Sequence, residues 1–306
     1  MFMDVFLSIF NNILEEGLIY GIMAMGVYIS YSVLDFPDLS VDGTFPLGMC
    51  ITAALITAGF NPFLSCIIAF ICGAVAGCVT GLLHVKLDIT NLLSGIITMM
   101  AMWSVNLVVT RGSAVLPYYN QPTIFTSGPI GILPEGLYTY RVVIIAALAV
   151  IVLKILLDMY LKTKSGLLLR AAGDNQQFVI SISRDPGKMK IIGLAIGNGY
   201  TALAGSILSQ QAESANINSG TGMVVMGLAS VIIGLSIFGK VKIMKATTMV
   251  VLGAVVYKAC LAIAMLLGLP TNFMKLLMAV IFTIALVSSN FMKKGRNKRH
   301  AETPEF

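Results

Sequence analysis

The sequence has few charged residues: only 11% of its 306 residues are Asp, Glu, Lys or Arg. A soluble domain carries about a quarter charged residues, so this chain lacks the polar surface of a water-soluble globule. Hydrophobic residues make up 57% of the chain, and its mean hydropathy is +0.90. These values exclude an ordinary soluble enzyme and indicate that the lipid bilayer is the solvent for most of the chain.

The sequence also lacks the motifs of common catalytic and metal sites. It contains no HExxH, GxSxG or GxxxxGK[ST] pattern. Its five cysteines form no CxxC pair, and they lie in apolar stretches as small hydrophobic residues do. We therefore expect no catalytic residue, no metal site and no cofactor bound by this chain. The five are Cys50, Cys66, Cys72, Cys78 and Cys260.

Long apolar runs are the main feature that the sequence has. The segment 2–14 places its apolar residues on one helical face, which predicts a helix lying in the membrane interface. The runs that follow are long enough to cross a bilayer. They predict an all-α polytopic membrane protein with about nine transmembrane helices. The predicted spans are 17–34, 43–60, 63–84, 91–110, 140–161, 191–213, 222–238, 246–268 and 272–291.

The basic residues predict the orientation of these spans. With an odd number of spans, most of the 20 Lys and Arg residues fall on the side of the C-terminus. The positive-inside rule assigns this side to the cytoplasm, which places the N-terminus outside. The long loop 111–139 is then external and the charged loop 162–190 cytoplasmic. Because the cations lie between spans, the net charge of +6 does not indicate a nucleic-acid partner.

The chain shows signs of an internal repeat. Gly17 and Gly21 open the first span and Gly43-Thr44 begins the second, while Gly193 and Gly197 open the sixth and Gly220-Thr221 begins the seventh. In the predicted topology the two copies run in opposite directions, as in inverted-repeat transporters. Coincidence among 29 glycines is the alternative.

This organisation predicts one transmembrane domain, residues 1–291, followed by a basic cytoplasmic tail, 292–306. The repeat halves would be 17–110 and 191–291. They would be linked by the span 140–161 and the cytoplasmic loop 162–190, which is a candidate coupling loop.

Small residues recur every four positions in the third span, at Ala69, Gly73, Gly77 and Gly81. This spacing predicts close packing against another helix, in the same chain or in a second subunit.

Lys258 lies in the middle of the eighth span. A cation at such a position costs at least about 2.5–3.5 kcal/mol, so it should face a partner or water. It is either a pathway residue or half of a structural ion pair, with Glu213 or an acid of the 35–42 loop as the expected partner.

The loop 35–44, with the sequence DFPDLSVDGT, has two interpretations. A DxxD sequence at a membrane face can hold Mg²⁺ and a diphosphate, as in intramembrane prenyltransferases. Such enzymes need a second acidic cluster, and the remaining acids are scattered. Capping of the second span by Ser40 or Asp42 explains much of the loop without chemistry.

The inner loop carries the most specific pattern. The segment 166–175, GLLLRAAGDN, is followed by Ile180, Ile182 and the small-residue-rich stretch 195–205. Together with the sequence NLLSG at 91–95, these features resemble the branched-chain amino acid/ribose-type ABC importer permeases. The segment 35–48 is similar to the tryptophan/tyrosine-type branch of that family. The chain departs from the family pattern at Gln176, Gln177 and Phe178, where a small residue is usual after the Asn.

The resemblance implies a type II-like ABC importer fold and a permease without catalytic activity of its own. Two permeases would flank the pathway, here as a homodimer, and two cytoplasmic ATPases would use ATP and Mg²⁺. An extracytoplasmic binding protein would deliver a small solute, an aromatic or branched-chain amino acid. The implied ATPase-coupling residues are Gly166, Arg170, Ala171, Gly173, Asp174 and Asn175. Candidate pathway residues are Asn91, Ser94, Thr98, Thr221 and Met223.

Two other functions remain open at this point. An ion-coupled secondary transporter with inverted repeats would need intramembrane carboxylates, of which the spans offer hardly any. An intramembrane Mg²⁺-dependent prenyltransferase-like enzyme would need the second acidic cluster.

The predicted orientation can be tested by cysteine labelling in intact cells, in a variant whose native cysteines are replaced. We expect an impermeant reagent to label Asn120→Cys directly and Lys298→Cys only after permeabilisation. Labelling of Lys298→Cys but not Asn120→Cys in intact cells would reverse the orientation.

Overall fold

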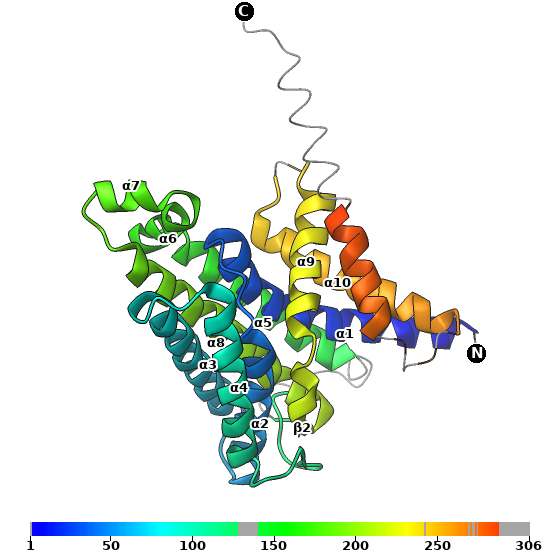
Figure 1. Ribbon diagram of the computed structural model, residues 1–306. Coiled ribbons are helices and arrows are strands. Elements are labelled where there is room, and N and C mark those ends of the chain that lie inside the picture. The colour runs from blue at the N-terminus through cyan, green and yellow to red at the C-terminus, as the bar shows by residue number, and fades with distance from the viewer. Residues whose placement is uncertain are drawn as a thin grey trace, which may run out of the picture.

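The computed structural model describes residues 2–127, 140–241, 243–268, 270, 273 and 275–287. Helices dominate, and a single pair of short strands accompanies them in the described part of the chain (Figure 1). The long helices are α1 (Phe2–Tyr28), α2 (Val41–Thr57), α3 (Pro62–Lys86), α4 (Asn91–Val109), α5 (Arg141–Tyr160), α8 (Pro186–Ala212), α9 (Met223–Phe238) and α10 (Ala246–Leu266). The short elements are the π-helix η1 (Ile29–Val33), α6 (Lys164–Asp174), α7 (Gln176–Ser181), the 3₁₀ helix η4 (Ile217–Gly220) and the strands β1 (Val115–Pro117) and β2 (Ser214–Asn216).

Seven helical segments of the described chain are long and apolar enough to cross a membrane, which confirms a polytopic membrane protein. Two further apolar helices, α2 and Lys275–Val287, are shorter than 18 residues. The count of nine spans stays a prediction. The predicted tail 292–306 lies outside the described residues.

The N-terminal segment differs from its prediction. Residues 2–14 do not form a separate interfacial helix, because α1 runs without a break from Phe2 to Tyr28. Asn11, a polar residue of this segment, donates a hydrogen bond of 2.6 Å to Glu15, one turn further along α1. The helix α1 therefore includes residues 2–14, although their hydrophobic pattern predicts a separate helix in the membrane interface.

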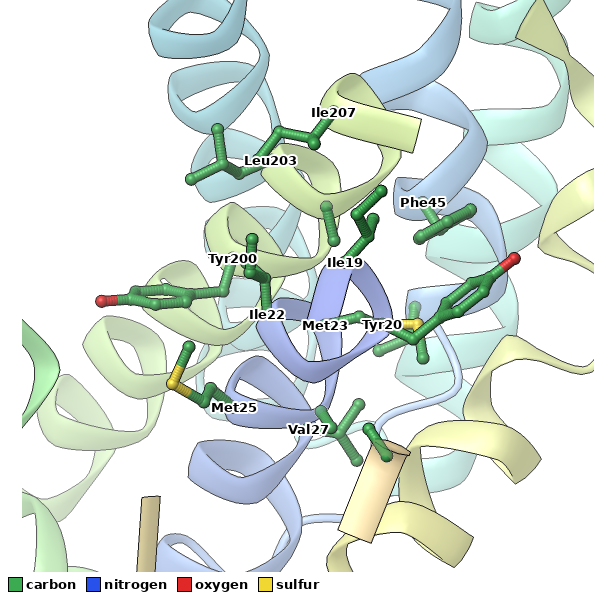
Figure 2. Close-up of a cluster of buried hydrophobic side chains, with 14 of the residues drawn as sticks. Ile19, Tyr20, Ile22, Met23, Met25, Val27, Phe45, Tyr200, Leu203 and Ile207 are labelled. Carbon is green, nitrogen blue, oxygen red and sulfur yellow. The ribbon is translucent and has the colours of Figure 1, made fainter. Parts of the chain in front are cut away.

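The core is formed by α8 and the three helices that pack on it, α1, α2 and α3. Buried side chains from α1, α2 and α8 meet there, among them Ile19, Met23, Phe45 and Leu203 (Figure 2). Hydrophobic transfer from water does not hold helices together inside a bilayer, so this core is stabilised by close packing and hydrogen bonds.

The small-residue face of α3 packs against α8, which confirms the predicted helix contact and places it within one chain. A Cβ added at Gly77 would lie 2.2 Å from the carbonyl oxygen of Leu194, and one at Gly73 would lie 2.6 Å from that of Asn198. Ala69 is also buried. Only glycine at positions 73 and 77 allows the two backbones to come this close.

The strands β1 and β2 connect two distant parts of the chain. They pair antiparallel, with Leu116 opposite Ala215, and tie the segment after α4 to the connection between α8 and α9. Figure 1 shows this connection toward one end of the bundle and α6 and α7 at another. The predicted loop 111–139 is described only as far as residue 127.

The α3–α8 contact gives a stability prediction. Gly77→Val should separate the helices and lower stability by about 1–3 kcal/mol, because side chains forced into a packed core strain it. Thermal unfolding of the purified protein in detergent would measure the change. Val75→Leu, on the outward face of the same helix, is the control and should unfold at the parental temperature. Equal unfolding temperatures for both variants would contradict the packing assigned here.

Candidate coupling surface and transport pathway

The helix α6 carries the predicted coupling motif. Its first turn is capped by Thr163, whose Oγ1 accepts a hydrogen bond of 3.2 Å from the Gly166 N–H. Leu169 and Ala172 are buried, whereas Leu167 and Arg170 are exposed. The helix is therefore amphipathic, with one face on the bundle and the other free for contact.

Two glycines of the motif allow α6 to lie on the ends of other helices. A Cβ at Gly166 would lie 2.3 Å from the carbonyl oxygen of Tyr160, at the end of α5. A Cβ at Gly173 would lie 2.0 Å from the carbonyl oxygen of Val33, in the π-helix η1. Any larger residue at either position would push α6 away from these helix ends.

The coupling segment 166–178 forms two helices and not one. Asn175 has extended backbone angles, φ −149° and ψ 99°, and separates α6 from α7. Its Oδ1 accepts a hydrogen bond of 3.1 Å from the Phe178 N–H and so caps α7. An asparagine side chain competes well for such N–H groups, which is why the helix breaks here. Phe178 and Ile180 of α7 are exposed.

Arg170 faces a cleft of about 240 Å³ at the foot of α5 and α10. Asp158 lines it and binds Lys245 and Lys154 through distances of 2.9 and 3.3 Å. Arg170 itself makes no hydrogen bond or ion pair with another described residue. Of the other coupling residues, Ala171 is half-buried, and Asp174 and Asn175 are exposed. The coupling role of all six stays a prediction.

A buried polar cluster follows η1 and connects the 34–40 segment to α8. The Asn198 Nδ2 donates a hydrogen bond of 2.7 Å to Asp38, and the hydroxyls of Ser40 and Thr44 donate to the Asn198 Oδ1 over 3.0 and 2.7 Å. The Ser40 N–H donates to the other Asp38 oxygen over 2.8 Å. These bonds satisfy polar groups that would otherwise be buried at a cost of several kcal/mol.

Asp42 caps a different helix from the one predicted. Its carboxylate accepts hydrogen bonds from the N–H groups of Gly222 and Val224, over 3.0 and 2.8 Å, at the start of α9. Ser40 stands at the start of α2 but makes no side-chain cap there. The predicted cap of the second span is therefore wrong, and the acid links the starts of α2 and α9.

Both α2 and α9 begin part-way along α8. The first turn of α2 bonds to Asn198, in the middle of α8, and Thr52 bonds to Ser206 over 2.6 Å further toward the end of α8. Because α9 begins against Asp42, it starts at the same level. The segment 34–40 and the segment 213–222 thus re-enter the bundle before each helix starts, a feature of transporters with discontinuous helices.

The predicted pathway residues do not form one group. Ser94 and Thr98 of α4 are fully buried, and Thr98 bonds with Thr80 of α3 over 2.9 Å. Asn91 instead lines a cavity between the α3–α4 turn and the start of α8. Thr221 is exposed and Met223 is half-buried at the start of α9. Their role in a pathway stays a prediction.

Lys258 pairs with Glu16 of α1, not with Glu213 or an acid of the 35–42 loop. Its ammonium also lies 4.3 Å from the centre of the Tyr20 ring. Glu213 instead accepts a 3.4 Å hydrogen bond from the Asn120 N–H. The partner was not predictable because Glu16 lies 242 positions away in the sequence.

The chain matches a protein family over nearly its whole length. The family described as "Branched-chain amino acid transport system / permease component" matches residues 9–286. The chain belongs to this permease family. It is 38% identical to the tyrosine transport system permease protein of Clostridioides difficile (strain R20291), over 91% of this chain and 90% of that protein.

More distant permeases match as well. The chain is 26% identical to the ribose import permease protein RbsC of Escherichia coli (strain K12), over 73% of this chain and 68% of that protein. It is 29% identical to an uncharacterized protein of Rickettsia prowazekii (strain Madrid E), over 92% and 98% of the two chains. No solved structure matches.

Membership of the permease family bears on the alternatives. The family consists of permease components of transport systems, which argues against an intramembrane enzyme and against an ion-coupled carrier that works as a single chain. Among the described residues, no group of three His, Cys, Asp or Glu side chains is placed to hold a metal ion. Of the DxxD sequence, Asp38 is buried and bonded to Ser40 and Asn198.

The cap that Asp42 forms at the start of α9 gives a second stability prediction. Asp42→Ala should lower the free energy of unfolding by about 0.5–2 kcal/mol, because two N–H groups of α9 lose their acceptor. Asp42→Asn keeps an acceptor oxygen and should retain most of the stability. Thermal unfolding in detergent compares the two variants, and an Ala variant as stable as the Asn variant would contradict the assignment.

Proposed function

We propose that this permease is the membrane subunit of an ABC importer for an aromatic amino acid. The observation that carries the proposal is the 38% identity, over most of both chains, to a permease named for tyrosine transport. In this proposal a binding protein outside the cell delivers the amino acid, and two ATPase subunits in the cytoplasm bind ATP and Mg²⁺. The permease lies in the cytoplasmic membrane with its C-terminus inside and its N-terminus outside.

The exposed faces of α6 and α7 support ATPase docking at this end of the bundle. Leu167, Phe178 and Ile180 present apolar side chains to the surface, and Arg170 provides a charge beside them. An apolar helix face next to a free guanidinium suits a groove with an acidic rim. Because Gly166 and Gly173 hold α6 against α5 and η1, a movement of α6 would be passed to those helices.

The inverted repeat and the nine spans belong to the same proposal. The pairing of helices supports it: α1 packs on α10 while α8, its counterpart in the other half, packs on α3. The predicted counterparts also meet, because a Cβ at Gly220 would lie 1.9 Å from the carbonyl oxygen of Asp42, beside Gly43. This exchange of partners is what a two-fold relation between the halves requires.

A homodimer would complete the pathway. Apolar residues are exposed along α3, α4 and α5, so these helices offer surface to lipid or to a second copy. Two copies of the chain in the purified complex are expected by quantitative mass spectrometry or by cross-linking. One copy beside a related permease would show a heterodimer.

The function is tested by uptake of labelled L-tyrosine into proteoliposomes. These would contain the permease, its ATPase and its binding protein. We expect uptake that requires ATP and the binding protein. Uptake driven by an ion gradient without ATP would favour a secondary transporter instead.

The coupling role is tested with Arg170→Glu and Ala171→Trp. Both should lower uptake and ATPase stimulation about tenfold or more while insertion stays normal. Arg170→Glu removes a contact of about 1–3 kcal/mol, and Ala171→Trp places a bulky side chain where the ATPase would dock. Lys164→Glu, a charge reversal at the start of α6, is the matched control. Normal uptake by both variants with a fully assembled ATPase would refute the assignment.

A further inference from the structure

A polar cavity lies between α1, the end of α8 and the segment that leads to α9. Its volume is about 610 Å³, within the range of small-molecule sites. Asn12, Glu15, Glu16 and Tyr20 of α1 line one side, and Gln211 of α8 lies on another. Asn216 and Ser219 line it as well, directly before the start of α9.

Two opposite charges meet at the wall of this cavity. Glu16 lines both it and a neighbouring pocket of about 240 Å³, which Lys258 also lines. Glu16 and Lys258 form an ion pair, yet their side chains are 34% and 14% exposed. The pair is therefore open to the cavities and not sealed between helices.

The second acid of α1 is held in place. The Glu15 carboxylate accepts hydrogen bonds from the Asn11 Nδ2 over 2.6 Å and from the Gln211 Nε2 over 2.9 Å. The ring of Tyr20 lies under the ammonium of Lys258 and stacks with Phe45 at 6.0 Å. The cavity thus combines two carboxylates with an aromatic side chain, and the ammonium of Lys258 lines the adjoining pocket on the other side of Glu16.

We propose that this cavity and the adjoining pocket, which share Glu16 as a wall, bind the solute on its way through the permease and recognise it as a zwitterionic α-amino acid. The solute ammonium binds Glu16, and the solute carboxylate binds Lys258. The ion pair between the two side chains is thereby replaced by two ion pairs with the solute. The inference rests on the proposed function and names its substrate class.

The charges also explain what the cavity excludes. A zwitterion leaves no charge uncompensated when it enters between Glu16 and Lys258. A solute with one charge leaves one partner unpaired, and a sugar separates the two charges without replacing either. Ser219, which lines the cavity, lies two residues before Thr221, one of the candidate pathway residues.

The test uses the assembled transporter in proteoliposomes, with native cysteines replaced and Ser219→Cys introduced. We expect L-tyrosine to slow modification of this cysteine by a thiol reagent. The double variant Glu16→Gln/Lys258→Met, which leaves no unpaired charge, should lose this protection. Its uptake of L-tyrosine should also fall at least about tenfold, as expected for loss of charge-assisted bonds.

Three controls separate recognition from structure. Lys258→Arg keeps the charge and should retain protection. Glu213→Gln removes a nearby acid outside the cavity lining and should behave as the parent. Tyramine and 4-hydroxyphenylpropionate, which lack the carboxylate and the ammonium respectively, should protect at least about tenfold less well than L-tyrosine.

Protection that is the same in the parent and the double variant would overturn the inference, as would equal protection by tyramine. Absence of protection in a parent that takes up L-tyrosine would also overturn it. Absence of any ATP-dependent uptake by the parent would instead refute the proposed function.

Discussion

The close approach of α8 to its neighbours is the constraint on which the fold depends. Helices inside a bilayer gain little free energy from leaving lipid. The van der Waals contact between closely packed backbones therefore has to hold the helices together. Gly26, Gly73 and Gly77 bring α1 and α3 onto α8, and Gly48 and Gly205 do the same between α2 and α8. The same closeness allows short side chains such as Ser40, Thr44 and Thr52 to hydrogen-bond across the helices.

The two re-entrant segments create a problem that this packing solves. A helix that starts inside the bundle leaves its first N–H groups without partners, and lipid cannot supply them. Asp42 provides the acceptors for α9, and the cluster around Asn198 fixes the chain that leads into α2. The polar residues of this region therefore stabilise the fold, whichever solute the permease transports.

The sequence predicted some parts of this well and others not at all. Composition and run length predicted a polytopic helical membrane protein, and the four-residue spacing in α3 predicted a close helix contact. These signals are local. The cap from Asp42 to α9 and the pair between Glu16 and Lys258 join residues about 180 and 242 positions apart, and nothing in a local pattern names such partners. The break at Asn175 has only a weak signal in the sequence, because the helix propensity of one asparagine is weak evidence beside the apolar residues on either side. The role of the coupling and pathway residues lies in assembly with other chains, which one chain does not contain.

The π-helix η1 has a consequence for the length of the chain between α1 and α2. A π-turn holds one residue more than an α-turn, which rotates all that follows it relative to the helix before it. The turn stands between Tyr28 and the segment with Phe36 and Asp38, both of which are buried, and its Val33 carbonyl is the contact for Gly173. Deletion of one residue from Ile29–Val33 would restore a regular α-helix but turn Asp38 away from Asn198. The number of residues in this connection is thus as tightly constrained as their identity.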